Sequence, residues 1–250
     1  MRFIIPAAPA RSLKLAIAAL AFTALLVWGQ AAPTAGKDLR GIWRTQRNVD
    51  GSLESARVIV DPPDGKIPYL PGALATLKQN LENRATADPE TRCFQPGVPR
   101  ATYLPSPFQI FQNDRGVYIV YQDVHAYRII YLDSSAHNQG LPYAMGDSRG
   151  HWEGDTLVAD VTSFSDATWL DAAGNYHSDA LHVVERYTRR DHYTLIYEAT
   201  IEDPKVFARP WKIRVPLRLQ TGPGVQILED ECVEDERGVR QHVRPFSAAK

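Results

Sequence analysis

The stretch "WKIRVPLRL", Trp211 to Leu219, alternates between apolar and polar side chains along its whole length. The apolar side chains recur at every second position: Trp211, Ile213, Val215, Leu217 and Leu219. A period of two is typical of a β-strand with one face in a protein core and the other in solvent. Pro216 lies on the polar side and indicates an edge position or a bulge, because proline cannot donate to a strand ladder.

Similar short runs, rich in Val, Ile, Tyr and Thr, fill much of the remaining chain, and turn signals such as "QNDRG" and "WEGDT" separate them. We expect further strands at residues 41–45, 55–61, 108–112, 116–122, 126–132, 156–162, 181–188, 193–201 and 225–231. Sequential short strands joined by tight turns predict an all-β fold. The expected architecture is an antiparallel meander, closed into a lipocalin-like barrel or folded as a bent sandwich.

One segment has a helical pattern instead. "PGALATLKQNLENR", which begins at Pro71, places Leu74, Leu77 and Leu81 on one face of a helix. We predict one short amphipathic helix near residues 72–84, which packs across a sheet or a barrel mouth. A parallel α/β fold would need helices between its strands, and the sequence predicts only this one.

The first 31 residues differ from the rest of the chain. Basic residues lead into an unbroken apolar run, Leu15 to Trp28, and small residues follow it. This order predicts a secretory signal peptide at residues 1–31, followed by a single β-rich domain at residues 32–250. The alternative is a retained membrane anchor, although a spanning helix needs about 20 apolar residues and this run is shorter. The expected location is therefore periplasmic or secreted, with no membrane partner after removal of the signal. The chain has 28 Lys and Arg against 29 Asp and Glu, and it lacks the basic excess that nucleic-acid binding requires.

Two cysteines, Cys93 and Cys232, lie outside the predicted signal peptide. An even count in an exported protein favours a disulfide between them, and two free thiols in the core are the alternative. The pair lacks the spacing of zinc sites and of thiol redox motifs.

Several blocks resemble a family of exported, uncharacterised bacterial proteins. The most specific blocks are "PFQI", "GDSRGHWEGDTLVADVTSF", "TWLDAAGNYHSDALHVVERY" and "EATIEDP". The resemblance implies export and a β-rich domain, and it implies no particular reaction. The triplet Gly41-Ile42-Trp43 is also similar to the G-x-W that opens lipocalin-type barrels, where the tryptophan plugs one end.

The segment "DATWLDAAGNYHSD", residues 166–179, concentrates polar and aromatic side chains around one glycine. Its centre, Asp171 to Gly174, fits a type I turn closed by a glycine with positive φ, so we predict a structural role there. A calcium loop would need oxygen ligands where Ala172 and Ala173 stand. The candidates for function are therefore the two arms of the turn.

The other candidate segment is the long loop from Ser134 to Gly150, since long loops in compact domains are often functional. The two segments flank the hairpin "GHWEGDTLVADVT", so we expect them to meet at one rim of the sheet and form a site. The expected catalytic residues are His137, Asp147, His177 and Glu185. The expected ligand-binding residues are Tyr143, Trp152, Asp166, Trp169 and Arg186.

Glu185 lies between Val183 and Tyr187 on an apolar strand face. A buried charge costs several kcal/mol unless it is paired. Glu185 is therefore either ion-paired, with an arginine such as Arg128 or Arg214, or held in a cavity with a raised pKa. Glu198 poses the same question on the next strand.

Two functions remain open, and a structural or assembly role is the third option if the protein has no cavity. The sequence contains no G-x-G-x-x-G, no GK[ST] and no tight histidine pair for a metal, so we expect no cofactor and no metal. Aromatic residues make up 10% of the chain and many fall on expected strands, which favours a barrel that binds a small apolar or aromatic molecule. The alternative is a cofactor-independent lyase, isomerase or hydrolase that uses a histidine and a carboxylate as acid and base.

Overall fold

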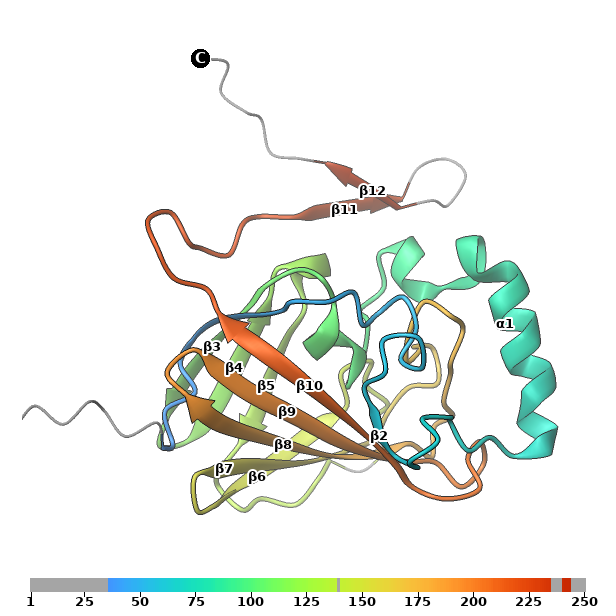
Figure 1. Cartoon of the computed structure of the whole chain (residues 1–250), viewed down its shortest axis with the longest axis horizontal. Helices are drawn as coiled ribbons and strands as arrows, with labels where there is room; N and C mark the ends of the chain where they lie inside the picture. Colours follow the sequence, from blue (N-terminus) through green and yellow to red (C-terminus); the bar gives the residue numbers. More distant parts are fainter. Residues whose placement is uncertain (1–35, 139, 235–239, 244–250) are drawn as a thin grey trace, which may run out of the picture. The chain divides into compact units, whose positions relative to one another are not determined.

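A computed structural model describes residues 36–138, 140–234 and 240–243 of the chain. The predicted signal peptide lies outside the described residues. Most described residues belong to a ten-stranded sheet, which Figure 1 shows wrapped around one interior. The strands are β1 (Gly41–Thr45), β2 (Ile59–Asp61), β3 (Phe108–Asn113), β4 (Gly116–Tyr121), β5 (Tyr127–Tyr131), β6 (Asp147–Glu153), β7 (Thr156–Thr162), β8 (His182–Asp191), β9 (Thr194–Glu202) and β10 (Trp211–Leu219).

The sheet closes into a nine-stranded barrel in the order β1-β3-β4-β5-β6-β7-β8-β9-β10, with β10 pairing back onto β1. The predicted all-β barrel is thus confirmed. Strand β1 closes it: Trp43 lies opposite Phe108 of β3 on one side and opposite Leu219 of β10 on the other. Gly41 is required beside this seam, because its φ is 135° and an added Cβ would lie 2.5 Å from the Leu219 side chain.

The tryptophan of the G-x-W triplet is fully buried. Its indole nitrogen donates to the carbonyl of Leu39 over 2.9 Å, and the guanidinium of Arg189 lies 5.3 Å from its ring centroid. Trp43 is therefore fixed by a hydrogen bond on its edge and by a cation over its face.

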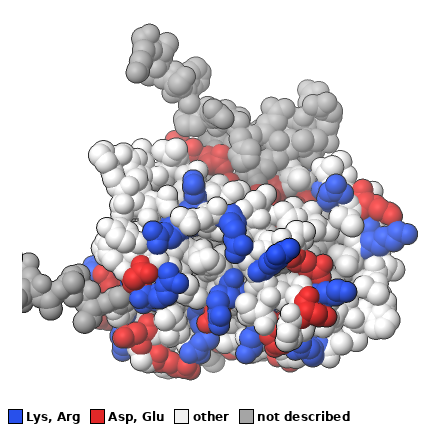
Figure 2. Space-filling view, in the orientation of Figure 1, with Lys and Arg blue, Asp and Glu red and all other residues white. Residues whose placement is uncertain are grey.

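The alternation in β10 is reproduced by the structure. Trp211, Ile213, Val215 and Leu217 are buried, whereas Lys212 and Arg214 are exposed. Strand β10 is not an edge strand, because β9 pairs with one side of it and both β1 and the short β2 pair with the other side. The edge position or bulge expected at Pro216 is therefore not observed: Pro216 lies opposite Ile196 of β9 in an unbroken register. Figure 2 shows basic and acidic side chains interspersed over the visible face, in keeping with a formal net charge of −1.

The antiparallel meander has one interruption. Strands β5 and β6 run parallel, and only two residue pairs join them, Ile130 with Ser148 and Tyr131 with Arg149. A parallel pair needs a connection that carries the chain back to the starting edge of the sheet, typically of a dozen residues or more. Residues 132–146 are that connection. The region predicted as loop to Gly150 therefore ends earlier, because Asp147 already begins β6.

The predicted helix is confirmed, with different ends and a different environment. A 3-10 turn, η1 (Pro71–Ala73), leads into α1 (Leu74–Ala87). None of the residues of α1 is buried, so the expected packing of its leucine face is wrong. The helix instead contacts the turn at Gly174 through Asn80, whose side-chain nitrogen donates to the Gly174 carbonyl over 3.2 Å.

The C-terminal part departs further from the prediction. Residues 225–231, expected as a strand, form no strand until Glu231, where β11 (Glu231–Glu234) begins and pairs with β12 (Arg240–Val243) in a separate two-stranded sheet. The apolar residues of the 225–231 stretch meet no neighbouring strand, and Val225 and Leu228 are exposed. Three further 3-10 turns complete the elements: η2 (Pro89–Arg92), η3 (Arg100–Tyr103) and η4 (Asp123–His125).

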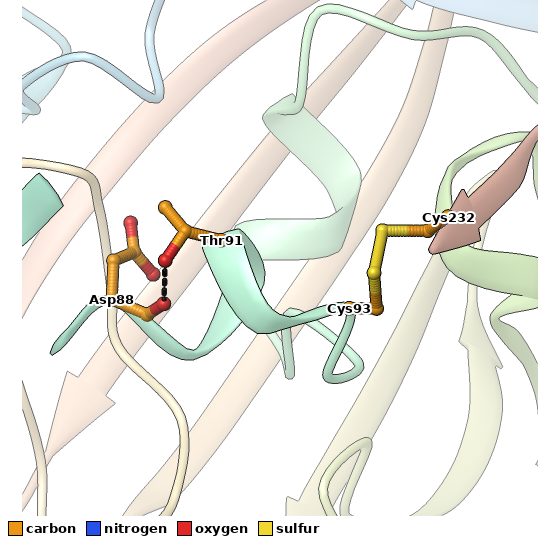
Figure 3. The surroundings of a disulfide bond; sticks show 4 residues. All are labelled: Asp88, Thr91, Cys93 and Cys232. Atoms are coloured by element: carbon orange, nitrogen blue, oxygen red, sulfur yellow. Dashed lines mark hydrogen bonds between the residues drawn. A yellow bond between two sulfur atoms is a disulfide. The ribbon is translucent and has the colours of Figure 1, made fainter. Parts of the chain in front are cut away.

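The predicted disulfide joins Cys93 to Cys232, with the two Cα atoms 5.5 Å apart. Figure 3 shows it between the turn after η2, where the hydroxyl of Thr91 donates to the Asp88 carbonyl, and strand β11. The bond closes a separation of 139 residues and ties the β11–β12 hairpin to the barrel domain. A structural disulfide indicates an oxidising, non-cytoplasmic compartment. Within the described ranges, no helix has the length and apolar character needed to span a bilayer.

We predict that the disulfide holds the hairpin and contributes little to the barrel. In the chain-entropy model a loop of this length contributes about 4 to 5 kcal/mol, but only if both cysteines are fixed in the folded protein by other contacts. Residues 221–226 are all exposed, and Cys232 follows this connection. The double variant Cys93→Ser with Cys232→Ser should therefore unfold within about 1 kcal/mol of the parent in urea, since few native barrel contacts change.

Hydrogen exchange measured by mass spectrometry separates the two regions. Peptides that cover β11 should exchange much faster in the double variant, while peptides that cover β8 and β9 should be unchanged. A loss of about 4 kcal/mol in barrel stability, the full loop-closure value, would contradict this prediction.

Candidate functional site

A buried ion pair crosses the barrel interior. Glu185 of β8 is fully buried and accepts two hydrogen bonds from Arg128 of β5, at 3.0 Å from Nη1 and 2.6 Å from Nη2. This is the ion-paired alternative of the two that the sequence left open for Glu185. Glu198 is paired too, but on the outer surface, with Arg214 at 2.9 Å.

Hydroxyl groups complete the coordination of the buried pair. Tyr187 and Tyr197 donate to Glu185 Oε1 over 3.0 and 2.8 Å, and Arg128 Nη2 donates to the Ser148 hydroxyl over 2.8 Å. Burial raises the pKa of both tyrosines well above its ordinary value, and the nearby Glu185 carboxylate acts in the same direction. Both phenols therefore stay protonated and remain donors. The cluster joins β5, β6, β8 and β9 through one carboxylate and one guanidinium.

A cavity of about 350 Å³ opens in the barrel wall where β5 and β6 separate. We call it the β5–β6 slot. Its lining residues are Gln95, Tyr127, Arg128, Ile129, Tyr131, Asn138, Tyr143, Ala144, Met145, Gly146, Asp147 and Ser148. The volume lies within the usual range for small-molecule sites.

The slot forms because the segment before β6 is hydrogen-bonded to residues beyond the end of β7 and not to β5. Tyr143 donates its backbone N–H to Ser163 over 2.8 Å and accepts from Ser165 over 2.9 Å, so this part of the loop is held towards the end of β7. The β5 residues Tyr127 to Ile129 consequently have no ladder partner in β6. The inward-facing Arg128 and Ser148 thereby become part of the lining of a surface cavity.

The rim of the slot carries a chain of histidines and carboxylates. His137 Nδ1 lies 2.9 Å from Asp147, and its Nε2 lies 2.8 Å from Asp160. The second oxygen of Asp160 lies 2.9 Å from His182 Nε2. Arg149 pairs with Asp147 at 2.9 Å. The expected contact between His137 and Asp147 is therefore present.

This geometry ties the loop to the barrel more than it prepares a base. A general base needs a ring nitrogen that is free to accept a proton. Both nitrogens of His137 face carboxylate oxygens, and the histidine satisfies both contacts as a donor only when both nitrogens carry protons. The chain His137–Asp160–His182 thus fastens the long loop to β7 and β8.

His177 lies in a different environment from His137. It is buried, with its Nδ1 2.9 Å from the Ser178 carbonyl and its Nε2 2.7 Å from the Thr168 hydroxyl. The carbonyl only accepts, so Nδ1 carries the proton and Nε2 accepts from Thr168. Burial lowers the pKa of His177, so the ring is neutral. The hydrogen bond with Thr168 joins the two arms of the 168–178 segment, and the expected convergence with His137 and Asp147 is not observed.

The turn inside that segment is built as predicted. Gly174 has a φ of 89° and donates to the Asp171 carbonyl over 3.3 Å, and an added Cβ at Gly174 would lie 2.8 Å from the backbone of α1. The Asp171 carboxylate is fully buried and accepts from the backbone of Leu53 over 2.9 Å and from the Asn175 side chain over 2.7 Å. Burial raises the pKa of Asp171 to about 6, although these donors act in the opposite direction. Asp171 therefore organises the turn, as expected.

The predicted ligand-binding residues are distributed over several places. Tyr143 lines the slot, and Trp152 lines a second cavity of about 640 Å³ with Lys37 and Arg40 among its other residues. Trp169 is buried and bridges to Tyr176 across the turn, whereas Asp166 is exposed. Arg186 faces outward and pairs with Glu153 at 2.8 Å. Only Tyr143 and Asp147 of the predicted site residues thus line the slot.

Sequence reasoning missed most of the slot. Strand β5 places Tyr127, Ile129 and Tyr131 on its outer face and Arg128 on its inner face. The period of two in "AYRIIYL" was the sequence signal that could have revealed this outer face. Gln95 and Asn138 carry no local signal. Asp160 and His182 lie on regular strands, where polar outward residues are ordinary.

Over the described ranges, no group of three or more His, Cys, Asp or Glu side chains is arranged to hold a metal ion. Comparison with models of protein families and with curated proteins finds no match for the chain. The interpretation of the site therefore depends on its own geometry.

We predict that breaking the buried ion pair destabilises the barrel strongly. Arg128→Met leaves the Glu185 carboxylate buried without its cation, which costs about 3 to 5 kcal/mol. Adding Glu185→Gln removes the second charge and keeps an acceptor for the tyrosines, so the double variant should recover part of the loss. Urea unfolding followed by tryptophan fluorescence measures both.

The matched control is Arg214→Met, which removes the cation from the exposed pair with Glu198. It should cost no more than about 1 kcal/mol. Equal losses for Arg128→Met and Arg214→Met would show that the interior pair has no special role.

We predict that His177 makes stability depend on pH. Its pKa in the folded protein is lower than the unfolded value near 6.5, so the unfolded chain takes up a proton first as the pH falls. Neutral His177 contributes its full stabilisation at any pH above the unfolded pKa. This contribution is lost as the pH falls below the unfolded pKa. His177→Gln should be about 1 to 2 kcal/mol less stable at pH 7.5, because a buried hydrogen bond is lost.

The difference in unfolding free energy between the parent and His177→Gln should shrink between pH 7.5 and pH 5. Urea titrations at four pH values give this difference directly. A difference that grows as the pH falls would contradict the neutral, structural role.

Proposed function

We propose that this chain is an exported β-barrel protein that binds a small molecule in the β5–β6 slot. The ligand offers an apolar or aromatic face and carries hydrogen-bonding groups. The observation that carries the proposal is the slot itself, a cavity of about 350 Å³ that combines tyrosines with a buried arginine.

The interior of the barrel favours a site in the wall. Large side chains that point inward are fully buried, among them Trp43, Tyr187, Tyr197, Phe108 and Ile119. Together with the Arg128–Glu185 pair they pack the space that open lipocalin-type barrels use for a ligand. The aromatic strand residues that face inward therefore belong to the core, and the outward-facing tyrosines of β5 are the ones available for binding.

The lining supports a ligand with mixed character. Tyr127 is 64% exposed and Tyr131 is 39% exposed, so both rings present area that a ligand can cover. Arg128 Nε is buried and has no hydrogen-bond partner among the described residues. Arg128 itself lines the slot, so its guanidinium adds a polar group beside the rings.

Export is supported by two independent features. The Cys93–Cys232 disulfide needs an oxidising compartment to form and persist. The basic, apolar and small-residue order of residues 1–31 is that of a secretory signal. Together they favour the periplasm or the cell exterior as the place where the slot meets its ligand.

An enzyme is the second candidate, and the His137–Asp147 contact of 2.9 Å favours it. Asp147 lines the slot, so a bound molecule would lie beside this pair. Catalysis would require His137 to give up its contact with Asp160 and use that nitrogen in proton transfer. The present geometry, with both nitrogens engaged, favours binding over catalysis.

We predict that the slot retains a small molecule from a complex mixture. The purified protein would be incubated with a periplasmic extract, washed and denatured, and the released compounds identified by mass spectrometry. At least one compound should be enriched with the parent, and its retention should fall about tenfold in Tyr143→Ala, because a lining aromatic ring is lost.

Tyr193→Ala is the control, since Tyr193 is an exposed tyrosine outside the slot lining. It should retain the compound as the parent does. If nothing is enriched, or if Tyr143→Ala retains the same amount, the slot is not the binding site. Appearance of a chemically altered compound that is lost in His137→Gln would instead support the enzyme.

A further inference from the structure

The chemistry of the slot narrows the class of its ligand. Its lining combines aromatic rings, Tyr127, Tyr131 and Tyr143, with the amides of Gln95 and Asn138. Amides both donate and accept hydrogen bonds, and so do tyrosine hydroxyls. This mixture fits a ligand whose polar groups both donate and accept hydrogen bonds and whose carbon skeleton has an apolar surface.

The charges at the slot are neutralised from within the protein. Arg128 is paired with Glu185, and Asp147 is paired with Arg149 at 2.9 Å and with His137 at 2.9 Å. A charged ligand would have to compete with these pairs in a partly desolvated place. A neutral ligand does not have to break these pairs. The Asp147 carboxylate can accept a hydrogen bond from it, and hydroxyl groups of the lining can donate or accept one, while the present pairs are kept.

The aromatic surface continues beyond the slot. Tyr127 lies opposite Val120 of β4, and Tyr118 of β4 lies between Ile129 of β5 and Phe111 of β3. Phe111 is 47% exposed and Val120 is 38% exposed, so this outer face is accessible to solvent. Contiguous exposed apolar surface of this kind on a soluble protein marks an interaction site.

One ring at the slot, that of Tyr131, is held in place before any ligand arrives. The guanidinium of Arg149 lies 4.7 Å from the centroid of the Tyr131 ring. Tyr127 and Tyr131 lie on the same outer face of one strand, so their Cα atoms are about 13 Å apart. That span is longer than one sugar ring, and rings fixed on a strand lose little conformational entropy on binding.

We propose that the slot and the outer face of β3–β5 bind a neutral carbohydrate chain. This inference rests on the proposed function and names its ligand class. Pyranose rings have faces of C–H groups that stack on tyrosine, and hydroxyl rims that pair with amides, carboxylates and hydroxyls. One sugar unit enters the slot and contacts Asn138 and Gln95, and the following units extend over Tyr127 and Tyr131.

Other ligand classes fit these observations less well. A lipid chain or a purely aromatic compound would cover the amides of Gln95 and Asn138 without offering them hydrogen-bonding groups, at a cost of about 1 to 3 kcal/mol for each unpaired group. A polyanion would meet a guanidinium that Glu185 already neutralises. A neutral polyhydroxyl compound satisfies both the rings and the polar groups.

The test is isothermal titration of the mature protein with cellohexaose, xylohexaose, maltohexaose and N-acetylchitohexaose. We expect at least one to bind, and binding should weaken about tenfold in Tyr127→Ala and in Tyr131→Ala. Both residues are solvent-exposed, so the variants should fold, which thermal unfolding checks. Tyr193→Ala is the matched control and should bind as the parent does.

The outcomes separate this inference from the proposed function. Binding that depends on Tyr127 and Tyr131 supports the carbohydrate. Retention of another small molecule from the extract in a Tyr143-dependent manner, with no binding of the four oligosaccharides, overturns the carbohydrate and leaves the binding function standing. Oligosaccharide binding that is equal in the parent and both tyrosine variants also overturns the inference, because the chain then lies elsewhere.

Discussion

The structure depends on one buried ion pair, Arg128 with Glu185. The pair lies inside a barrel whose other inward side chains are mainly apolar, where an unpaired charge would cost several kcal/mol. Two tyrosine hydroxyls and Ser148 satisfy most of the remaining hydrogen-bonding groups, so the pair is kept in one geometry. Such pairs contribute less to net stability than to specificity, since an apolar replacement of the same volume is often as stable. In this protein the pair specifies how the wall of the barrel is arranged. It connects β5 to β8 across the place where only two residue pairs join β5 to β6.

The parallel contact between β5 and β6 links topology to the slot. Two residue pairs hold these strands together, whereas β8 and β9 align along nearly their whole length. The interior pair adds a second link between β5 and the second half of the barrel, because Arg128 of β5 bonds Glu185 of β8. The weak ladder also leaves the backbone near Tyr127 without a partner in β6, and it opens the cavity that reaches Arg128 and Ser148. The same feature that requires an internal fastening therefore creates the site.

The fold was largely predictable because its signals are local. Alternation along Trp211 to Leu219, the turn at Asp171 to Gly174 and the helix after Pro71 each need only neighbouring residues to interpret. The disulfide was predictable for a different reason, because the chain has only two cysteines to pair. Glu185 was recognised as a buried charge from its neighbours, although its partner could only be narrowed to a few arginines. The parallel pairing of β5 with β6 had no local signal, since residues 132–146 have the composition of any loop. His177 was misplaced for the same reason: Thr168, the partner of its Nε2, is an ordinary residue, and only the folded turn brings it to the ring.

The long loop illustrates why length alone is an ambiguous sign of function. A parallel pair requires a long connection whatever the protein does, so residues 132–146 have a topological reason to exist. What goes beyond that requirement is how firmly the loop is fastened. His137 is held between Asp147 and Asp160, and Tyr143 is paired with Phe164, just after β7. A connection that only returned the chain would need none of these contacts. Fastened in this way, the loop forms one fixed side of a cavity whose other side is β5, and a fixed wall lowers the entropic cost of binding a ligand there.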